Sequence, residues 1–445
     1  MNENRIFIFE FVSGGGFTQV DIPPSLFCEG YGMLRSIIAD FKSVDFEIFT
    51  LLDYRIKSLS YYLNADLIKE INARDNFIKK YKESIKECEY CFIIAPEFSR
   101  ILYELTKIAI DNDKKVLSIG LKGIKMSESK IKTYDFFKDR KVYTPQTHLI
   151  PFKNESLDLD FIIREFRKIK HPIIIKPEDG VGAESIYYFE NEAQIYNFFN
   201  VSISKIEPTR NFILQEYIEG EDLSVSLIGC SESTIQNVNK PIVLSINSQD
   251  ITIKNSHSGS EYYGGYTPVE EYDEKLKILS KALEKLDLSE FSGYFGIDFI
   301  KKHDNTLHFI EINPRLTTSY IGIRNVIDKN PVELILNSNS NYFNPIEINY
   351  QNYSIFSRLE LQYGGNDPFY GIDNNMISKL MKKVPELITP PIYFDNSNQN
   401  SKNGNISCFF ATKEKTMEKS RNRVTEIINC FEKYGLNAIN KSNLE

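Results

Sequence analysis

The chain has 445 residues, of which 42% are hydrophobic and 26% charged, and its formal net charge is −8. This is the composition of a globular protein with roughly two to four compact units, and it argues against wholesale disorder. The acidic balance argues against a protein held on nucleic acid by bulk charge, although a local basic cleft could still bind phosphates. No stretch approaches eighteen consecutive apolar residues, so no transmembrane helix is expected.

The remaining bulk features predict a cytoplasmic protein with reduced thiols. The first five residues are polar and lead directly into a short apolar run, which is not the pattern of a secretory signal. Six cysteines in a chain of this length do not form a disulfide framework. Cys88 and Cys91 have redox or zinc spacing, but no second pair accompanies them, so ordinary packing is the better interpretation.

The N-terminal segment alternates strand and helix patterns. Apolar runs typical of buried strands cover residues 6–12, 44–51, 90–95 and 115–119. Helical spacing covers residues 26–41 and 99–113. This alternation predicts a small doubly wound, Rossmann-like α/β domain over residues 1–120.

The glycine-rich break Ser13–Gly16, directly after the first strand, invites a dinucleotide-binding interpretation. Its spacing is not Gly-x-Gly-x-x-Gly, and no suitable helix starts at once. We therefore favour a turn near a substrate site. An NAD-type oxidoreductase stays open as a function of a different class.

The middle of the chain predicts an α+β region over residues 121–335. A helix is expected at residues 127–139, and a longer one at 269–286. Strand patterns occur at residues 171–176, 185–189, 212–218, 223–228, 242–246, 294–300 and 307–312. We divide this region into a lid at about residues 140–215 and a metal-binding part at about 216–335.

The last part of the chain predicts a small C-terminal subdomain, residues 336–445. Asn- and Ser-rich stretches begin near residue 337 and recur at 395–405, as expected for loops or linkers. Between and after them lie strand patterns at 355–361 and 406–411, and an amphipathic helix that ends at Tyr434 before a glycine.

The most informative segment is a predicted hairpin that brings acidic side chains together. A polar break centred on Asp304 and Asn305 separates two apolar strands. Pairing about this turn places Asp298 opposite Glu311, and Asn313 lies two residues further on the same face. Facing carboxylates destabilise a sheet unless something neutralises them. A set of oxygen ligands without Cys or His suits Mg²⁺ or Mn²⁺ rather than Zn²⁺.

Two further segments could hold a nucleotide. A buried strand ends at Lys176 and leads into a loop with Gly180 and Gly182, which offers a cation and approachable backbone N–H groups to phosphates. The segment Gln215–Ile218 could present backbone to an adenine edge, and Asp222 could accept ribose hydroxyls. Each signal alone is weak, and the Walker pattern is absent.

Taken in order, these segments resemble the ATP-grasp superfamily of carboxylate–amine ligases. The resemblance implies an ATP-grasp fold with a Rossmann-like leading domain, central and ATP-binding subdomains, and a small C-terminal extension. It implies ATP and Mg²⁺ (or Mn²⁺) as cofactors. The roles that it implies are phosphate binding by Lys130, Lys176, Gly180 and Gly182, adenine binding by Gln215, Glu216, Tyr217 and Ile218, ribose binding by Asp222, metal binding by Asp298, Glu311 and Asn313, and phosphoryl-transfer catalysis by Lys176 and Arg315.

Three segments look most like the tyramine–L-glutamate ligases of methanofuran biosynthesis, namely Phe9–Gly16, Tyr263–Gly265 and Glu311–Tyr320. This resemblance covers about residues 1–330. It implies that ATP activates the γ-carboxylate of glutamate as an acyl phosphate and that tyramine then attacks it. A ligase for another amino acid or peptide pair and a non-catalytic nucleotide sensor stay open. We expect small-molecule substrates and neither nucleic-acid nor membrane partners, and a homodimer stays open.

Overall fold

The computed structural model describes most of the chain. The described residues are 4–153, 156–180, 185–201, 203, 206, 210–230, 240–253, 260–339, 347–365, 372–392 and 406–440. Within these ranges, no helix combines the length and the apolar character needed to cross a membrane.

The N-terminal part is the parallel sheet with helices that the alternating pattern predicts. The strand order is β3-β2-β1-β4-β5, so β1 is central. Its apolar residues are fully buried, as expected for a central parallel strand. The prediction omitted β3, a partly exposed strand at the sheet edge whose Lys69 and Glu70 interrupt the apolar pattern. The strands are β1 (Arg5–Glu10), β2 (Glu47–Asp53), β3 (Leu67–Ile71), β4 (Tyr90–Ile94) and β5 (Lys115–Val116). The helices are α1 (Pro24–Lys42), α2 (Phe77–Ile85) and α3 (Ile101–Asp111).

The helix predicted at residues 127–139 is present as α5 (Lys130–Asp139), and a second helix that was not predicted, α4 (Leu121–Ser127), precedes it. The break falls at Ser129, whose backbone is extended and whose side chain accepts a hydrogen bond from the Lys132 N–H. Ser129 is therefore the N-cap of α5. This cap places Lys130 in the first turn of the helix.

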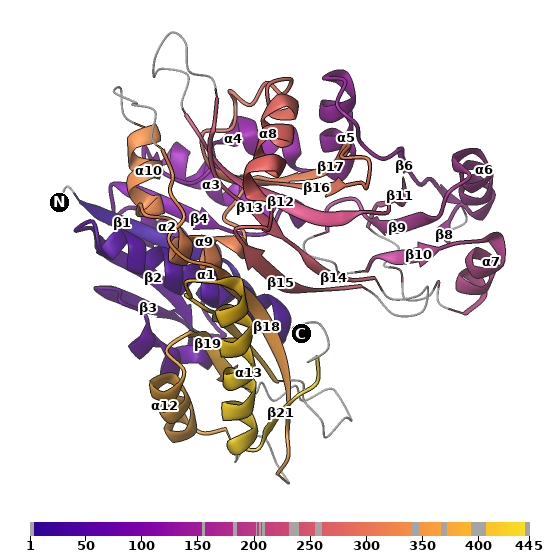
Figure 1. Ribbon diagram of the computed structural model, residues 1–445. Coiled ribbons are helices and arrows are strands. Elements are labelled where there is room, and N and C mark those ends of the chain that lie inside the picture. The colour runs from indigo at the N-terminus through magenta and orange to yellow at the C-terminus, as the bar shows by residue number, and fades with distance from the viewer. Residues whose placement is uncertain are drawn as a thin grey trace.

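The lid region has its own sheet and its own core. The sheet order is β10-β9-β11-β6, and each pairing is antiparallel. Its separate apolar cluster includes Ile175, Phe198 and Leu214. In Figure 1 this region extends away from the rest of the molecule at the right. Its elements are β6 (Thr147–Leu149), β7 (Phe152–Lys153), β8 (Ser156–Leu157), α6 (Leu159–Ile169), β9 (Ile173–Pro177), β10 (Tyr187–Phe189), α7 (Glu192–Val201) and β11 (Phe212–Glu216).

A central antiparallel sheet lies between the lid region and the N-terminal part. Its order is β13-β12-β16-β17, so the predicted hairpin forms one side of it. Its strands are β12 (Glu221–Gly229), β13 (Ile242–Ser248), β16 (Gly293–Lys301) and β17 (Leu307–Asn313). The helices around it are α8 (Tyr272–Leu283), α9 (Ser319–Val326) and α10 (Pro331–Ser338).

The C-terminal segment has a separate apolar cluster but shares its sheet with the preceding region. The order β14-β15-β18-β20-β19, with β21 beside β18, joins strands from both sides of residue 335. The domain limits at residues 120 and 335 stay predictions. The elements are β14 (Asp250–Thr252), β15 (Glu261–Thr267), β18 (Ser354–Tyr363), α12 (Asn374–Lys383), β19 (Leu387–Ile392), β20 (Ile406–Ala411), α13 (Met417–Lys433) and β21 (Leu436–Ala438). Figure 1 shows α12 and α13 below the N-terminal sheet.

A buried charge cluster joins α1 to α9, the helix that follows the site hairpin. Asp40 on α1 accepts a hydrogen bond from the Tyr320 hydroxyl at 2.7 Å and another from Arg324 Nη2 at 2.6 Å. Asp40 is 7% exposed, so its carboxylate depends on these partners rather than on water. The cluster therefore fixes the N-terminal part against the segment that carries Arg315.

We expect Asp40→Asn to lower the free energy of unfolding by about 3 kcal/mol, because it leaves the Arg324 guanidinium without its counterion. Urea unfolding measures the change. Glu70→Gln is the matched control, since it removes an exposed pair with Lys57, and we expect it to cost less than about 0.5 kcal/mol. Equal losses in the two variants would show that the cluster does not hold these elements together.

Candidate active site

The hairpin places the two acidic side chains as predicted, but by a different route. Asp298 on β16 pairs directly with Glu311 on β17. Nearer the turn the register differs by one residue, because Phe299 pairs with Phe309 and a bulge at Ile310 absorbs the difference. The predicted pairing of Asp298 with Glu311 is therefore confirmed, whereas a regular hairpin without a bulge is wrong.

The pKa values of the two carboxyl groups are shifted in opposite directions. Burial, reinforced by the charge of Glu311, raises the pKa of Asp298 to about 7. Asn313 partly offsets this shift, because its Nδ2 donates a hydrogen bond to Asp298 Oδ2 at 3.0 Å. Burial alone would also raise the pKa of Glu311, but the charges of Lys130 and Lys176 lower it overall.

Two lysines from different elements face this acidic pair. Lys130, in the first turn of α5, lies with its Nζ 2.9 Å from Glu311 Oε2 and donates a hydrogen bond to the Gly180 carbonyl at 2.7 Å. Lys176, on β9 of the lid region, is only 4% exposed, and burial lowers the pKa of its ammonium to about 8. The hairpin and the lid thus bring opposite charges to one place.

A single pocket collects most of the residues predicted for nucleotide and metal binding. Ten of them line it: Lys130, Lys176, Gln215, Tyr217, Ile218, Asp222, Asp298, Glu311, Asn313 and Arg315. Gly180 borders a smaller pocket beside Lys130, and Glu216 faces a separate hollow near His171. Gly182 lies outside the described residues. Most of the predicted residues therefore lie in one pocket, although the role of each stays a prediction.

The far end of this pocket is built where β11 leads into β12. Gln215 is 2% exposed, and its Nε2 donates a hydrogen bond to Thr147 Oγ1 at 2.8 Å, which fixes the end of β11. Burial raises the pKa of Asp222, at the start of β12, to about 6. Ile174, Ile186 and Ile300 add apolar surface to the same walls. Such a combination suits a flat ring with a few polar edges.

Arg315 directly follows the hairpin and lies at the boundary between this pocket and a second one. Its Nε is 3.0 Å from Glu97 Oε1, on the loop that follows β4. Burial alone would lower the pKa of the guanidinium, but Glu97 raises it overall. Arg315 is thus a fixed positive charge between two cavities.

The second pocket, of about 430 Å³, was not identified from the sequence as a cavity. It shares Glu29, Tyr262 and Arg315 with the first pocket. Arg358, from the C-terminal sheet, also lines it. The sequence signals near this pocket are the Phe9–Gly16, Tyr263–Gly265 and Glu311–Tyr320 segments of the family resemblance, the last of which contains Arg315.

The glycine-rich segment Val12–Gly16 forms a π-helical turn whose first residue, Val12, lines this second pocket. The Glu10 carboxylate accepts hydrogen bonds from the backbone N–H groups of Val12 at 3.0 Å and Ser13 at 2.7 Å. Gly15 has φ of +96°, a conformation that side chains rarely adopt. The turn therefore shapes the pocket around Glu10, and no helix starts directly after it as a dinucleotide fingerprint requires.

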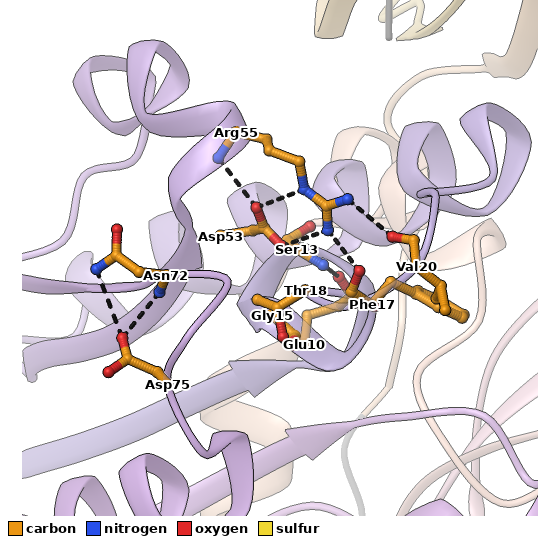
Figure 2. Close-up of polar contacts among 10 residues, drawn as sticks. All are labelled: Glu10, Ser13, Gly15, Phe17, Thr18, Val20, Asp53, Arg55, Asn72 and Asp75. Atoms are coloured by element: carbon orange, nitrogen blue, oxygen red, sulfur yellow. Dashed lines mark hydrogen bonds and ion pairs between the residues drawn. The ribbon is translucent and has the colours of Figure 1, made fainter. Parts of the chain in front are cut away.

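An arginine on the next strand connection fixes the end of this turn. Arg55 donates hydrogen bonds to the carbonyl groups of Phe17 at 2.6 Å and Val20 at 2.8 Å (Figure 2). The fully buried Asp53 holds the guanidinium in place through a hydrogen bond from Arg55 Nε at 2.9 Å. Phe17, which lines the second pocket, is thereby anchored to the N-terminal sheet.

Comparison with known families agrees with this geometry. Residues 127–319 match the family model of the ATP-grasp domain, and residues 46–122 match that of the pre-ATP-grasp domain. This chain belongs to the ATP-grasp superfamily. It is thus an ATP-binding ligase of the ADP-forming type, and its predicted fold class is confirmed.

Relatives and solved structures agree with this membership. The chain is 29% identical over 323 residues to the tyramine–L-glutamate ligase of Methanocaldococcus jannaschii, which covers 72% of this chain and 84% of the relative. A biotin carboxylase from Campylobacter jejuni has a TM-score of 0.63 at 15% identity, over 98% of this chain and 92% of that one. An N5-carboxyaminoimidazole synthetase from Staphylococcus aureus has a TM-score of 0.60 at 13% identity, over 95% and 96% of the two chains.

The raised pKa of Asp222 predicts a specific pH dependence of stability. Between about pH 4 and pH 6 the folded ATP-grasp protein keeps a proton on Asp222 that the unfolded chain has released. As the pH rises through this window, the wild type should therefore lose stability relative to Asp222→Asn. Urea unfolding at pH 4.5 and 7.5 should show the difference between the two proteins growing by about 2 kcal/mol in favour of the variant. A difference that does not change with pH would mean that Asp222 titrates normally.

Proposed function

We propose that this ATP-grasp ligase activates the γ-carboxylate of glutamate as an acyl phosphate and joins it to tyramine, a reaction of methanofuran biosynthesis. The curated relative with that activity covers most of the chain and supports the choice of substrates. We also propose that the protein works in the cytoplasm, in keeping with its six unpaired cysteines.

The facing pair of Asp298 and Glu311, opposite two lysines, is the observation that carries the proposal. A buried carboxylate with a pKa near 7 beside a second carboxylate is a site that a cation would stabilise. The donors are two carboxylates and the Asn313 amide, and the described residues hold no group of three or more His, Cys, Asp and Glu side chains placed to hold a metal ion. So few protein ligands, all oxygen, fit Mg²⁺ or Mn²⁺ that also binds nucleotide phosphates.

Asp298, Glu311 and Asn313 would hold this ion, which when bound supplies positive charge to the phosphate oxygens. Lys130 and Lys176 bind the same phosphates from the opposite side, and Lys176 keeps most of its charge at pH 7 because its pKa is about 8. Gln215–Ile218 and Asp222 hold the adenosine part. Displacement of Lys130 from Glu311 is then the main change within the site when the nucleotide binds.

Arg315 is placed where the two pockets meet, so it can stabilise charge on the phosphoryl group in transfer. A carboxylate oxygen of glutamate attacks the γ-phosphorus of ATP, and the bond to ADP breaks. The amine of tyramine then attacks the acyl carbon, loses a proton, and the phosphate leaves with the former carboxylate oxygen. No nucleophile from the protein is needed.

The second pocket has the chemistry that the two substrates require. Phe17, Leu26, Met33 and Phe98 give it an apolar part, which suits the ring of an aromatic amine. Glu10 gives it negative charge, which suits a protonated amine on its way to the acyl phosphate. Burial raises the pKa of the Glu10 carboxyl group, which makes it a better proton acceptor than an exposed carboxylate.

The substrate assignment is tested by an ADP-release screen of amino acids against amines with Mg-ATP. We expect glutamate with tyramine to give the fastest turnover and a product with one new amide bond. Turnover with another pair would support the ligase function but contradict the proposed substrates. ATP binding without turnover over the whole panel would favour the nucleotide-sensor alternative.

The metal assignment is tested by Asp298→Asn and Glu311→Gln, each of which removes one carboxylate charge. We expect ADP release with glutamate and tyramine to fall at least about 100-fold in each variant, because stabilisation of phosphoryl charge by the ion is worth several kcal/mol. Asp304→Asn is the matched control, since Asp304 lies in the exposed turn of the same hairpin and should leave turnover near that of the wild type. Full turnover in Asp298→Asn would refute the assignment.

A further inference from the structure

The second pocket contains a buried arginine that the proposed mechanism does not use. Arg358 lies on β18, beyond residue 319, where the match to the ATP-grasp domain ends. Its guanidinium lines the pocket together with that of Arg315. Two positive groups from distant parts of the chain therefore face one cavity.

Arg358 is incompletely paired in this position. The residue is 5% exposed, and its Nε has no hydrogen-bond partner among the described residues. Its Nη1 is 3.9 Å from Glu29 Oε1, and its Nη2 is 3.4 Å from Glu360 Oε1. Charge-assisted N–H···O bonds are normally about 2.7–2.9 Å long, so both contacts are loose. A buried guanidinium with an unused donor is costly to leave unsatisfied.

The guanidinium is nevertheless held firmly. It lies over the ring of Tyr263 at 5.0 Å from the centroid, a cation–π contact. The strand beneath it is fixed, because Ser357 Oγ donates to the Tyr263 carbonyl at 2.9 Å and Asn440 Nδ2 donates to the Arg358 carbonyl at 3.1 Å. Arg358 is thus preorganised for a partner rather than free to turn away.

Glu29 completes the arrangement from the opposite side. It lies on α1 of the N-terminal part and lines both pockets, as Arg315 does. Nη1 of Arg358 and Oε1 of Glu29 lie only 3.9 Å apart, so the two side chains present neighbouring positive and negative groups to the same pocket. A zwitterion can bind this pair from the pocket side, with its carboxylate on the guanidinium and its ammonium on the carboxylate.

We propose that Arg358 and Glu29 bind the α-carboxylate and α-ammonium groups of the amino-acid substrate, with its side-chain carboxylate directed to Arg315. This inference rests on the proposed function and adds to it a reason for the choice of a dicarboxylic amino acid. Two guanidinium groups in one pocket match two carboxylates, whereas a simple monocarboxylate directed to Arg315 leaves Arg358 with only its loose contacts. The C-terminal sheet then determines substrate specificity, although the nucleotide pocket is built without it.

The test compares glutamate with 4-aminobutyrate, which has the same chain and amino group but lacks the α-carboxylate. ADP release is measured at saturating Mg-ATP and tyramine. We expect Arg358→Gln to raise the KM for glutamate at least about 30-fold while kcat changes less than about threefold. The kcat/KM for 4-aminobutyrate, already low in the wild type, should be unchanged in the variant. Arg358→Lys keeps the charge and should recover part of the affinity for glutamate.

Arg35→Gln is the matched structural control. Arg35 is partly buried and joins α1 to the C-terminal segment, since its Nη1 donates to the carbonyl groups of Leu387 at 3.0 Å and Ile388 at 2.7 Å. It does not line the second pocket. We expect this variant to have a lower melting temperature but the KM of the wild type for glutamate.

Each outcome decides between the two claims. An unchanged KM for glutamate in Arg358→Gln, or an equal loss with glutamate and 4-aminobutyrate, overturns the role of Arg358 while the ligase function stands. If Arg358→Gln does not fold, the same criterion applies to Arg358→Lys. A wild type that releases no ADP with glutamate and tyramine refutes the proposed function itself, and the assignment of Arg358 fails with it.

Discussion

Two buried carboxylates that face each other across neighbouring strands are the constraint on which the rest of the site depends. Asp298 and Glu311 would repel each other in a sheet interior, where water screens charge poorly. This repulsion is offset by Lys130 from a helix N-terminus, Lys176 from the lid region and the amide of Asn313. The positions of α5 and of the lid strand β9 are thereby tied to one pair of side chains on the hairpin.

This arrangement explains why the cavities lie between separate sheets. The first pocket takes Lys176 from the lid sheet, the two acids from the central sheet and Lys130 from α5, so it forms where the lid sheet meets the central sheet. The second pocket takes Glu10 and Glu29 from the N-terminal part and Arg358 from the C-terminal sheet. Arg315 and Tyr262 line both pockets, so a molecule bound in one pocket can react with a molecule bound in the other.

The parts of the site that depend on local pattern could be predicted from the sequence. Turn residues and alternating apolar positions are sufficient to pair Asp298 with Glu311, although they do not reveal the bulge at Ile310. The proposed role of Arg358 could not be predicted, because the apolar pattern of β18 does not indicate which distant strand pairs with it. The pairing of β18 with β15 brings it to the pocket, and such long-range pairing leaves no local signal in the sequence.

The transfer of phosphate to a substrate carboxylate is tested most directly with glutamate labelled with ¹⁸O in its γ-carboxylate. The label is followed in the products after complete reaction with unlabelled ATP and tyramine. Our account predicts that each phosphate released carries one ¹⁸O atom, because the carboxylate oxygen that attacks the γ-phosphorus leaves with it. Unlabelled phosphate, or ¹⁸O found instead in AMP, would contradict the acyl-phosphate mechanism.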